Sequence, residues 1–424
     1  MTPSLLFVAL LGATTALRLW LGQRQIDAVL AHRDHVPAEF RQAVPPKAHR
    51  KAADYTVAKM RVTRWETLYD AVLILGWTLG GGLQWLIDLV ARLPLSPLSS
   101  GVVLILLFAA LSALLDAPFV LYRHFVVEAR FGFNRMTLRT LLADTIKGGL
   151  VTLVLATPLL YLLLWLPTAA GEAWWLYAWG AFFAFGLFVG WAWPTLIAPL
   201  FNRFTPLDDP TLRQAIESLL ARSGFHASGI YVMDGSRRSS HGNAYFTGFG
   251  RNKRIVFYDT LLERLDNDEV LAVLAHELGH FRHRHILKGL MLNGLTSLAG
   301  FALLAWWLPQ PAFYHALGVS TPVPAAGLIL FSIVVPLLTF FIAPLLAWLS
   351  RRHEFEADRY AARQTDADAL VSALVTLYRD NASTLTPDRL YSLFYDTHPP
   401  ASIRVAALRQ APNANSPATP AAMP

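Results

Sequence analysis

The sequence predicts a multi-span α-helical membrane protein that also carries a small α+β domain. Hydrophobic residues make up 54% of the 424-residue chain and charged residues only 15%, a composition too apolar for an ordinary soluble protein. Seven apolar runs come close to or exceed the roughly 20 residues that a helix needs to cross a bilayer. The Lys and Arg residues between these runs gather on one side of the resulting path.

The seven expected spans are separated by polar or proline-containing segments. They cover residues 3–21, 67–91, 102–122, 149–166, 174–200, 286–308 and 325–349. The first run lacks the basic start of a signal peptide, and Arg18 lies near its end, so we expect a retained span. The spans divide the chain into a five-span membrane domain, 1–200, and a second domain, 201–411, which contains the last two spans.

The distribution of basic residues predicts the orientation in the membrane. Nine Lys and Arg residues lie in 23–66 and five in 123–148, whereas the three segments on the other side carry one between them. By the positive-inside rule the N-terminus is expected outside, and the long segments 23–66, 201–285 and 350–424 are expected to be cytoplasmic. The net charge of +7 is then a signal of orientation. No basic patch interleaved with aromatic residues indicates a nucleic-acid partner.

The segment 201–285 has the composition of a soluble insert. We expect a helix over 210–223 and strands over 229–233, 243–247 and 254–258, because Val, Ile, Tyr and Phe are bounded there by Gly, Asn and Asp. Residues 412–424 consist of Pro, Ala, Asn, Ser and Thr with almost no large apolar group, and are expected to be a disordered tail.

A His-Glu-x-x-His motif predicts a metal site. His276 and His280 are one helical turn apart, so both imidazoles lie on one face and can share one Zn²⁺. Glu277 directly follows the first His, and its carboxylate can reach a water molecule at the metal without binding the metal itself. Gly279 weakens a helix by about 1 kcal/mol relative to Ala, which suggests close helix packing at this point.

The helix that carries the motif is expected over 268–285, with Asp268 as its N-cap. His283 and His285 lie at the start of a span, and we interpret them as basic interface residues rather than ligands. Because the chain has no cysteine, any metal must bind His, Asp or Glu. The alternative to a metal site is a chance match to a short pattern.

A two-His site needs a third protein ligand and an open position. Glu354 is the candidate, just after the last span. If this stretch is helical, Glu354 and Asp358 share a face and Glu356 points away. We therefore expect Glu354 on the metal, and Asp358 as a hydrogen-bond acceptor for the free ring nitrogen of a metal-bound His. Taken alone, such an acidic pair is more often a solvated, salt-bridged helix face.

These motifs belong to a longer set of matches, through which the chain resembles the CAAX prenyl protease 1 family of integral-membrane zinc metallopeptidases. The matching stretches are 132–134, 198–202, 235–246, 252–256, 258–262, 276–280, 354–358, 398–400 and Arg404. The resemblance implies seven transmembrane helices around a chamber, with a small gluzincin-type catalytic domain on the cytoplasmic side. It also implies one zinc ion on His276, His280 and Glu354, with Glu277 as the catalytic base.

The resemblance further implies roles for residues outside the zinc motif. The segment around Asn243, Ala244 and Tyr245 is expected to be an edge strand that lies along the substrate by β-augmentation, although an ordinary strand is the alternative. His398 is expected to stabilise the oxyanion, or else to be only a turn residue before two prolines. Arg404 is expected to orient Asp358 or Glu354. Residues 380–381 also match the family, with no role assigned.

Three functions remain open at this stage. The chain could be a protease for C-terminally prenylated substrates of CAAX type, or a membrane-protein quality-control protease without prenyl specificity. The third is a metal-regulated transporter, which would need several ionisable residues inside the spans, and Asp116 and Arg123 are too few. The lack of cysteine and the content of Ala, Leu and Arg favour a bacterial inner membrane. We expect the partners to be a peptide or prenylated-peptide substrate and the lipid bilayer, and the chain to act as a monomer.

Overall fold

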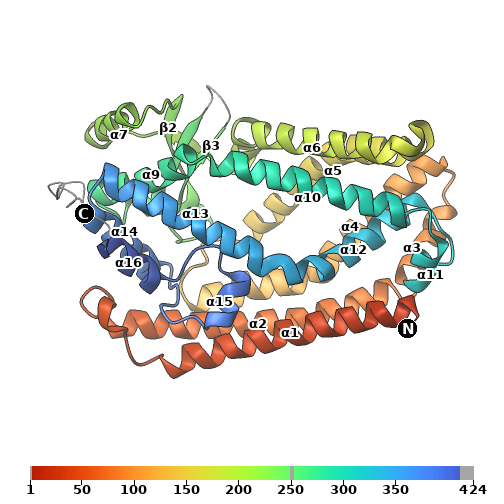
Figure 1. The fold of residues 1–424 in the computed structure, drawn as a ribbon, viewed down its shortest axis with the longest axis horizontal. Helices are drawn as coiled ribbons and strands as arrows, with labels where there is room; N and C mark the ends of the chain where they lie inside the picture. Colours follow the sequence, from red (N-terminus) through yellow and green to blue (C-terminus); the bar gives the residue numbers. More distant parts are fainter. Residues whose placement is uncertain (1, 249–252, 411–424) are drawn as a thin grey trace, which may run out of the picture.

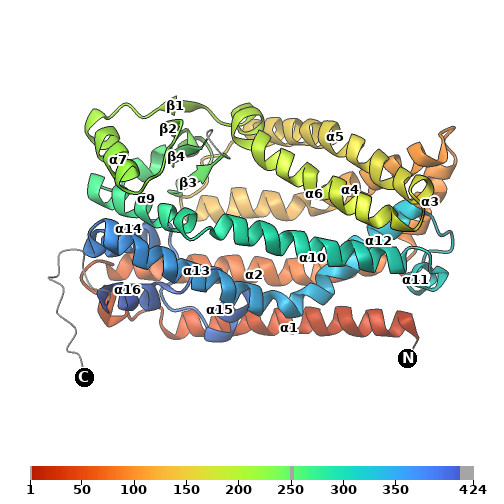
Figure 2. The same ribbon diagram turned by 45° about the horizontal axis from the view of Figure 1, so that its top comes forward.

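A computed structural model describes residues 2–248 and 253–410, so the tail expected over 412–424 lies outside the described residues. Long helices run side by side along the molecule, and the sheet and the shorter helices gather at the end opposite the N-terminus (Figure 1). The turned view shows strands β1 to β4 beside α7 and α9 at this same end (Figure 2).

The described chain contains six helical segments long and apolar enough to cross a membrane, and a seventh if the bent pair α2 and α3 is one span. The helices that build them are α1 Pro3–Ala31, α2 Pro46–Trp77, α3 Gly82–Ala91, α4 Pro97–Tyr122, α5 Leu138–Ala169, α6 Trp174–Ala192, α10 His285–Trp307, α12 Pro324–Thr339 and α13 Ala343–Gln364. Each of the seven predicted spans falls on one of these segments. The last helix continues well beyond the predicted end of its span, as far as Gln364.

The predicted span over 67–91 is not one straight helix. Its two parts, α2 and α3, meet at an angle of 48°. Three consecutive glycines cause the break: Gly81 has a φ of 78°, in the left-handed region, and a Cβ on Gly82 would lie 2.8 Å from the carbonyl oxygen of Gly76. Only glycine permits this turn inside an apolar run.

The spans contact one another in a closed order. α1 contacts α2 and α12, α4 contacts α5, α5 contacts α6, α6 contacts α10, and α10 contacts α12. Between α2 and α4 the link is made by α3 and by the π-helical turn η2, Arg123–Glu128. α12 also packs against α4 in an apolar core far from the sheet. A chamber inside this ring of helices stays a prediction.

The soluble insert forms a four-stranded sheet in the order β1-β2-β4-β3. Its strands are β1 Phe204–Pro206, β2 Gly229–Met233, β3 Ala244–Thr247 and β4 Arg254–Tyr258. β2 and β4 are parallel, and β3 pairs antiparallel with β4 only, so β3 is an edge strand. The three predicted strands are present, and β1 was not predicted.

Helices on the sheet complete this unit around one apolar core. They are α7 Pro210–Arg222, α8 Asp259–Leu262, α9 Asn267–Arg282, α14 Ala367–Asp380 and α16 Ala401–Gln410, with α15 Arg389–Tyr395 against α13. Short turns of 3-10 or π helix fill the connections: η1 Ala38–Phe40, η3 Gly171–Ala173, η4 Trp193–Ile197, η5 Ala198–Leu200, η6 Gly235–Arg237 and η7 Phe340–Ile342. Another short helix, α11 Pro311–Ala316, lies at the other end of the molecule.

The predicted helix over 268–285 differs from the structure at both ends. The N-cap is Asp266 and not Asp268, because Asp266 accepts from the N–H of Glu269 while the Glu269 carboxylate accepts from the N–H of Asp266. The helix stops at Arg282, and Arg284 with a φ of 56° separates α9 from α10. His285 therefore begins a new helix.

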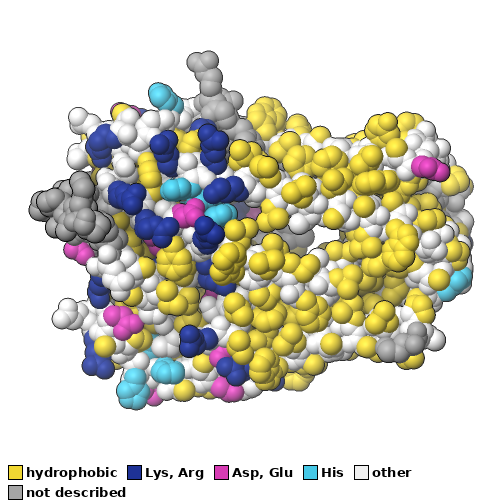
Figure 3. Space-filling view, in the orientation of Figure 1, with side chains coloured by type: hydrophobic (Ala, Val, Ile, Leu, Met, Phe, Trp, Pro, Cys, Tyr) yellow, Lys and Arg dark blue, Asp and Glu magenta, His cyan; other side chains and the backbone are white. Residues whose placement is uncertain are grey.

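Charge and apolar surface are strongly segregated along the molecule. Lys and Arg side chains gather at the end that carries the sheet, and the surface of the long helices is almost entirely hydrophobic (Figure 3). Exposed apolar residues such as Val72, Val154 and Leu295, each at least 65% exposed, need lipid around them rather than water. The protein is therefore an integral membrane protein with its polar unit at one end.

Candidate metal centre

Two crossing helices carry the candidate ligands: α9 bears His276 and His280, and α13 bears Glu354. The helices touch at Gly279, where an added Cβ would lie 2.8 Å from Cα of Ala357 and 3.0 Å from its carbonyl oxygen. Both atoms belong to a backbone that cannot rotate away. Glycine lowers the stability of a helix, but here it allows α9 and α13 to approach more closely than any other residue would. The close packing therefore offsets the loss of helix propensity.

We expect Gly279→Ala to push α9 and α13 apart and to weaken metal binding, because the ligands lie on both helices. Overpacking costs about 1–3 kcal/mol, which should exceed the gain of about 1 kcal/mol in helix propensity. Thermal unfolding and zinc titration would measure both effects. Gly289→Ala in α10 is the matched control, since a Cβ there meets nothing within 4 Å. Equal zinc affinity in the two variants would contradict the prediction.

The three candidate ligand residues form a compact triangle, in which each imidazole faces a different oxygen of the Glu354 carboxylate. Nε2 of His276 lies 3.2 Å from Nε2 of His280 and 3.5 Å from Oε2 of Glu354, and Nε2 of His280 lies 3.2 Å from Oε1 of Glu354. Ligands about 2.0–2.1 Å from a tetrahedral Zn²⁺ lie about 3.3–3.4 Å apart, so the triangle has the size that this ion needs. His276 and Glu354 are buried and His280 partly so, and among the described residues these three form the group that could hold a metal ion.

His276 is oriented by a buried ion pair. Its Nδ1 lies 2.8 Å from Oδ1 of Asp358, and Arg404 donates to both Asp358 oxygens at 2.9 and 2.6 Å. With its proton on Nδ1, His276 presents the lone pair of Nε2 to the centre of the triangle. Burial opposes the charged ring, but hydrogen bonds to Asp358 and Glu354 outweigh it and raise the pKa of His276 to about 9. A cation bound here therefore competes with a proton.

His280 is oriented by residues whose role was not predicted. Its Nδ1 lies 3.0 Å from Nδ1 of His285, and Nε2 of His285 lies 3.0 Å from Oε2 of Glu356. If Glu356 accepts from His285 and His285 accepts from His280, then Nε2 of His280 also carries a free lone pair. As expected, His285 begins the α10 span and is not one of the three candidate ligands, but its side chain is only 7% exposed, so it is not an exposed basic residue of the interface. The left-handed Arg284 turns it back towards the motif.

Both candidate histidines thus turn their Nε2 atoms towards the same point, 3.2 Å apart, and a carboxylate faces them. Oε2 of Glu354 is buried, and within the described part of the chain it accepts no hydrogen bond of good geometry, although Nδ1 of His398 lies 2.7 Å away. Two imidazole nitrogens and a carboxylate this close together in a buried site need a proton or a metal cation between them, and a metal displaces the proton when it binds. The donor set of two imidazoles and one carboxylate fits zinc, with one coordination position left for water or substrate.

The two residues expected to act in catalysis lie beside this triangle. Glu277 follows the first ligand on α9, is half-buried, and makes no side-chain hydrogen bond to any residue in the described part of the chain. His398, in the loop before α16, places Nδ1 2.7 Å from Oε2 of Glu354. Its side chain is 63% exposed, so it lies at the open side of the site.

The expected substrate strand lies next to the ligand helix. Ala244 and Tyr245 begin β3, whose outer edge pairs with no strand of the described chain, and β3 contacts α9. Asn243 is exposed and lies one residue before the strand, where its carbonyl accepts from the N–H of Tyr258 at 3.0 Å. Burial raises the pKa of Tyr245 to about 12, so its hydroxyl stays neutral.

Asn381, which had no role from the sequence, fixes the turn that leads into β3. Its side chain accepts from the N–H of Gly242 at 3.2 Å and donates to the carbonyl of the same residue at 3.4 Å. The neighbouring His241 stacks on Phe133 with ring centres 4.5 Å apart and lies 3.6 Å from Glu128. The start of the edge strand is thereby held both by α14 and by the N-terminal membrane domain.

Comparisons with known proteins cover nearly the whole chain. Residues 25–203 match the CAAX prenyl protease N-terminal domain of five membrane helices, and residues 206–411 match peptidase family M48. The human CAAX prenyl protease 1 homolog is 33% identical over 456 aligned residues that cover 95% of each chain. CAAX prenyl protease 1 of Saccharomyces cerevisiae is 36% identical over 71% of this chain and 70% of its own length.

The crystal structure of S. mikatae Ste24p has the same fold as this chain. It superposes with a TM-score of 0.90 at 30% sequence identity and covers 96% of this chain and 99% of that one. The likeness therefore includes both the membrane helices and the metallopeptidase unit.

The fold and the site together define a membrane-embedded metallopeptidase. Apolar spans, a triangle of residues that could hold a metal ion and a matching peptidase family all lead to this class, and the transporter alternative gains nothing from them. Within the class, the chain belongs to peptidase family M48, among the CAAX prenyl protease 1 proteins.

Proposed function

We propose that this chain is a zinc endopeptidase that cleaves C-terminally prenylated, CAAX-type peptides at the membrane surface. The observation that carries the proposal is the triangle of His276, His280 and Glu354, built on helices that continue as, or adjoin, membrane spans. The substrate class comes from the relatives, which are CAAX prenyl proteases by name. A quality-control protease without prenyl specificity is the second candidate, since the same site would serve it.

Different residues of the chain have separate roles in the proposed reaction. Zinc on the triangle, when bound, would supply a Lewis acid and lower the pKa of a water molecule to about 7. Glu277 takes the proton of the attacking water and passes it to the leaving amine. His398 donates a hydrogen bond to the oxyanion, and Asp358 with Arg404 keeps His276 in the correct tautomer. The open edge of β3 holds the substrate as an added strand through Asn243, Ala244 and Tyr245.

The orientation and the partners belong to the same proposal. The basic residues at the metallopeptidase end favour the cytoplasm on that side, with the N-terminus outside. We retain a monomer as the working state and a peptide as the partner. The relatives named above are eukaryotic, so the bacterial inner membrane suggested by composition has no support from them.

A peptide that ends in a farnesylated cysteine and three further residues tests the function. We expect the zinc-loaded protein to release the last three residues, a chelator to stop the reaction, and added zinc to restore it. The matched peptide without the farnesyl group should be cleaved at least about tenfold less efficiently in kcat/KM. That ratio needs only about 1.4 kcal/mol, the burial of about two methylene groups.

The outcomes separate the two candidates. Equal cleavage of both peptides would favour the quality-control protease and remove prenyl specificity from the proposal. No cleavage of either peptide by zinc-loaded, folded protein would overturn the peptidase function itself.

A further inference from the structure

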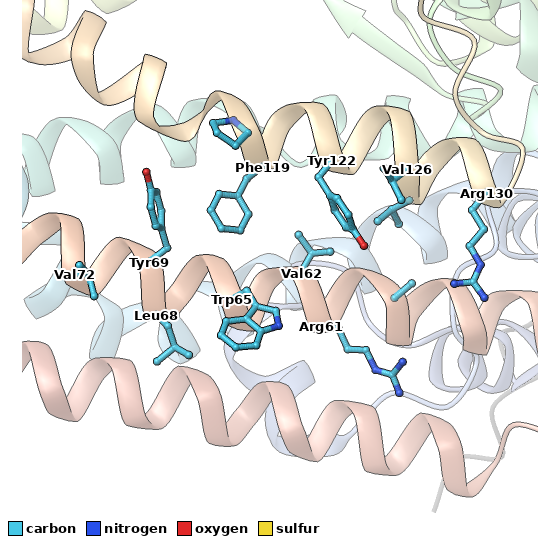
Figure 4. Close-up of a pocket in the computed structure, with 13 residues that line it drawn as sticks. Arg61, Val62, Trp65, Leu68, Tyr69, Val72, Phe119, Tyr122, Val126 and Arg130 are labelled. Atoms are coloured by element: carbon cyan, nitrogen blue, oxygen red, sulfur yellow. The ribbon is translucent and has the colours of Figure 1, made fainter.

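A groove of about 800 Å³ runs between α2 and α4, away from the metal centre. It lies between one face of α2, where lining residues recur every three or four positions, and the facing side of α4 and η2 (Figure 4). Its volume lies in the range of small-molecule sites. The proposed peptidase mechanism makes no use of it.

The middle of the groove is aromatic and apolar. It is lined by Trp65 and Tyr69 of α2 and by Phe119 and Tyr122 of α4, and Tyr69 points towards Phe119 (Figure 4). Tyr69 crosses between the helices: its ring centre lies 5.1 Å from that of Phe119 and its hydroxyl donates to the carbonyl of Leu115 at 2.9 Å. Trp65 is 69% exposed, which indicates that the groove opens towards lipid.

Two arginines from different helices stand at one end of the groove. Arg61 lies one turn before Trp65 on α2, and Arg130 follows η2 (Figure 4). Among the described residues, neither guanidinium has a carboxylate within 4.0 Å or donates a hydrogen bond. The guanidinium of Arg130 lies over the ring of Phe131, whose centre is 5.6 Å away.

The other cations near the groove are already engaged. Arg123 pairs with both carboxylate oxygens of Glu66, and Lys59 lies 4.0 Å from the centre of the Tyr55 ring. Arg61 and Arg130 are therefore the cations on the groove wall that have no acidic partner in the described chain. An anion bound at this end of the groove would balance the positive charge of the two arginines.

The charged end lies on the side of the metallopeptidase domain. Tyr55 lies nearer to the start of α2 than Arg61 does. It packs in one apolar cluster with Ala382, which follows α14. Towards the opposite side, Val72 is 11 residues beyond Arg61, a rise of about 16 Å along the helix. A molecule with its anionic group at the arginines would thus point its apolar part towards the bilayer centre.

We propose that the groove binds one anionic phospholipid from the leaflet next to the metallopeptidase domain. Its phosphate would lie between Arg61 and Arg130, and an acyl chain would lie along Trp65, Tyr69, Phe119 and Tyr122. An isoprenoid chain carries no charge and would leave both arginines unmatched. Each basic residue near an anionic lipid contributes about 1 kcal/mol, about fivefold in affinity, so the pair distinguishes anionic from zwitterionic lipid by about 25-fold.

Native mass spectrometry of the full-length protein in detergent would test the proposal. The probes are phosphatidylglycerol, phosphatidylcholine with the same chains, glycerol phosphate and a farnesylated peptide. We expect one phosphatidylglycerol per chain to be retained about 25-fold more tightly than phosphatidylcholine, and glycerol phosphate not to compete. The double variant Arg61→Gln with Arg130→Gln should lose this preference, and Val126→Trp, which fills the groove, should lose retention with both arginines present.

Arg139→Gln is the matched control, because Arg139 is an exposed arginine near the start of α5 that does not line the groove. It should retain phosphatidylglycerol like the unaltered protein, with all variants keeping the same thermal unfolding midpoint to within a few degrees. Equal retention by the control and the double variant would overturn the proposal. So would equal binding of the two phospholipids, or stoichiometric displacement of phosphatidylglycerol by the farnesylated peptide.

Discussion

A Glu277→Gln variant should keep its bound metal and lose about 10²–10⁴-fold in kcat for peptide hydrolysis. Glu277 lies beside the ligand triangle but is not part of it, so its charge is not needed to hold the ion. Glutamine has the same shape as glutamate and leaves helix α9 unchanged. Its amide cannot accept the proton of the attacking water, and the proton then has no acceptor at the reacting atoms.

Metal content of the purified variant and single-turnover cleavage of a peptide would measure the two halves of this prediction separately. Glu217→Gln, at an exposed position of α7, makes the same chemical change far from the triangle and should be fully active. If Glu277→Gln retained the activity of this control, Glu277 would not be the base. If Glu277→Gln lost its metal, Glu277 itself would have to be a fourth protein ligand.

The membrane helices were largely predictable because hydropathy is a local property of the sequence. Each apolar run became a helix, and the main error lay in 67–91, which bends at Gly80, Gly81 and Gly82. That signal was present in the sequence, since three glycines in succession are rare inside a span. The N-cap at Asp266 could also have been found, because Glu269 stands at the third position after it and completes a capping box.

The placement of the ligands was predictable in part, because helical spacing puts His276 with His280 and Glu354 with Asp358. That these two pairs face each other follows from tertiary packing at Gly279, where the sequence indicates a close helix contact but not which helix makes it. The burial of the His285 side chain was missed for a related reason. In one continuous helix it would point well away from the ligand face, and only the left-handed Arg284 brings it to His280.

The contacts of Asn381 show the limit of reasoning from one sequence. Its partner Gly242 lies 139 positions earlier, and no local pattern connects an asparagine after a helix with the turn before an edge strand. The role of Arg404 depended on family resemblance in the same way, since Asp358 lies 46 positions before it. Pairings over such distances are set by the fold as a whole.

A Glu354→Gln variant should lose zinc affinity by about 10²–10³-fold, and with it all activity at trace metal. Protein zinc sites gain about 10–16 kcal/mol from about four ligands, so a weakened ligand costs about 3–4 kcal/mol. Glu356→Gln is the matched control on the same helix: it points away from the triangle and keeps an oxygen that can accept from His285. Its zinc affinity should fall by no more than about 10–100-fold.

Zinc titration of the chelator-treated proteins, followed by both metal binding and peptide cleavage, would distinguish a ligand from a structural residue. If Glu354 binds the ion, high zinc should restore binding before it restores cleavage, because a neutral amide leaves the triangle with more positive charge and a different donor strength. If Glu354 only stabilises the packing of α13, the variant should unfold at a lower temperature. The fraction that remains folded should then bind zinc with normal affinity. The same affinity in both variants would show that the carboxylate facing His276 and His280 is not the third ligand, and that the triangle is a hydrogen-bonded cluster instead.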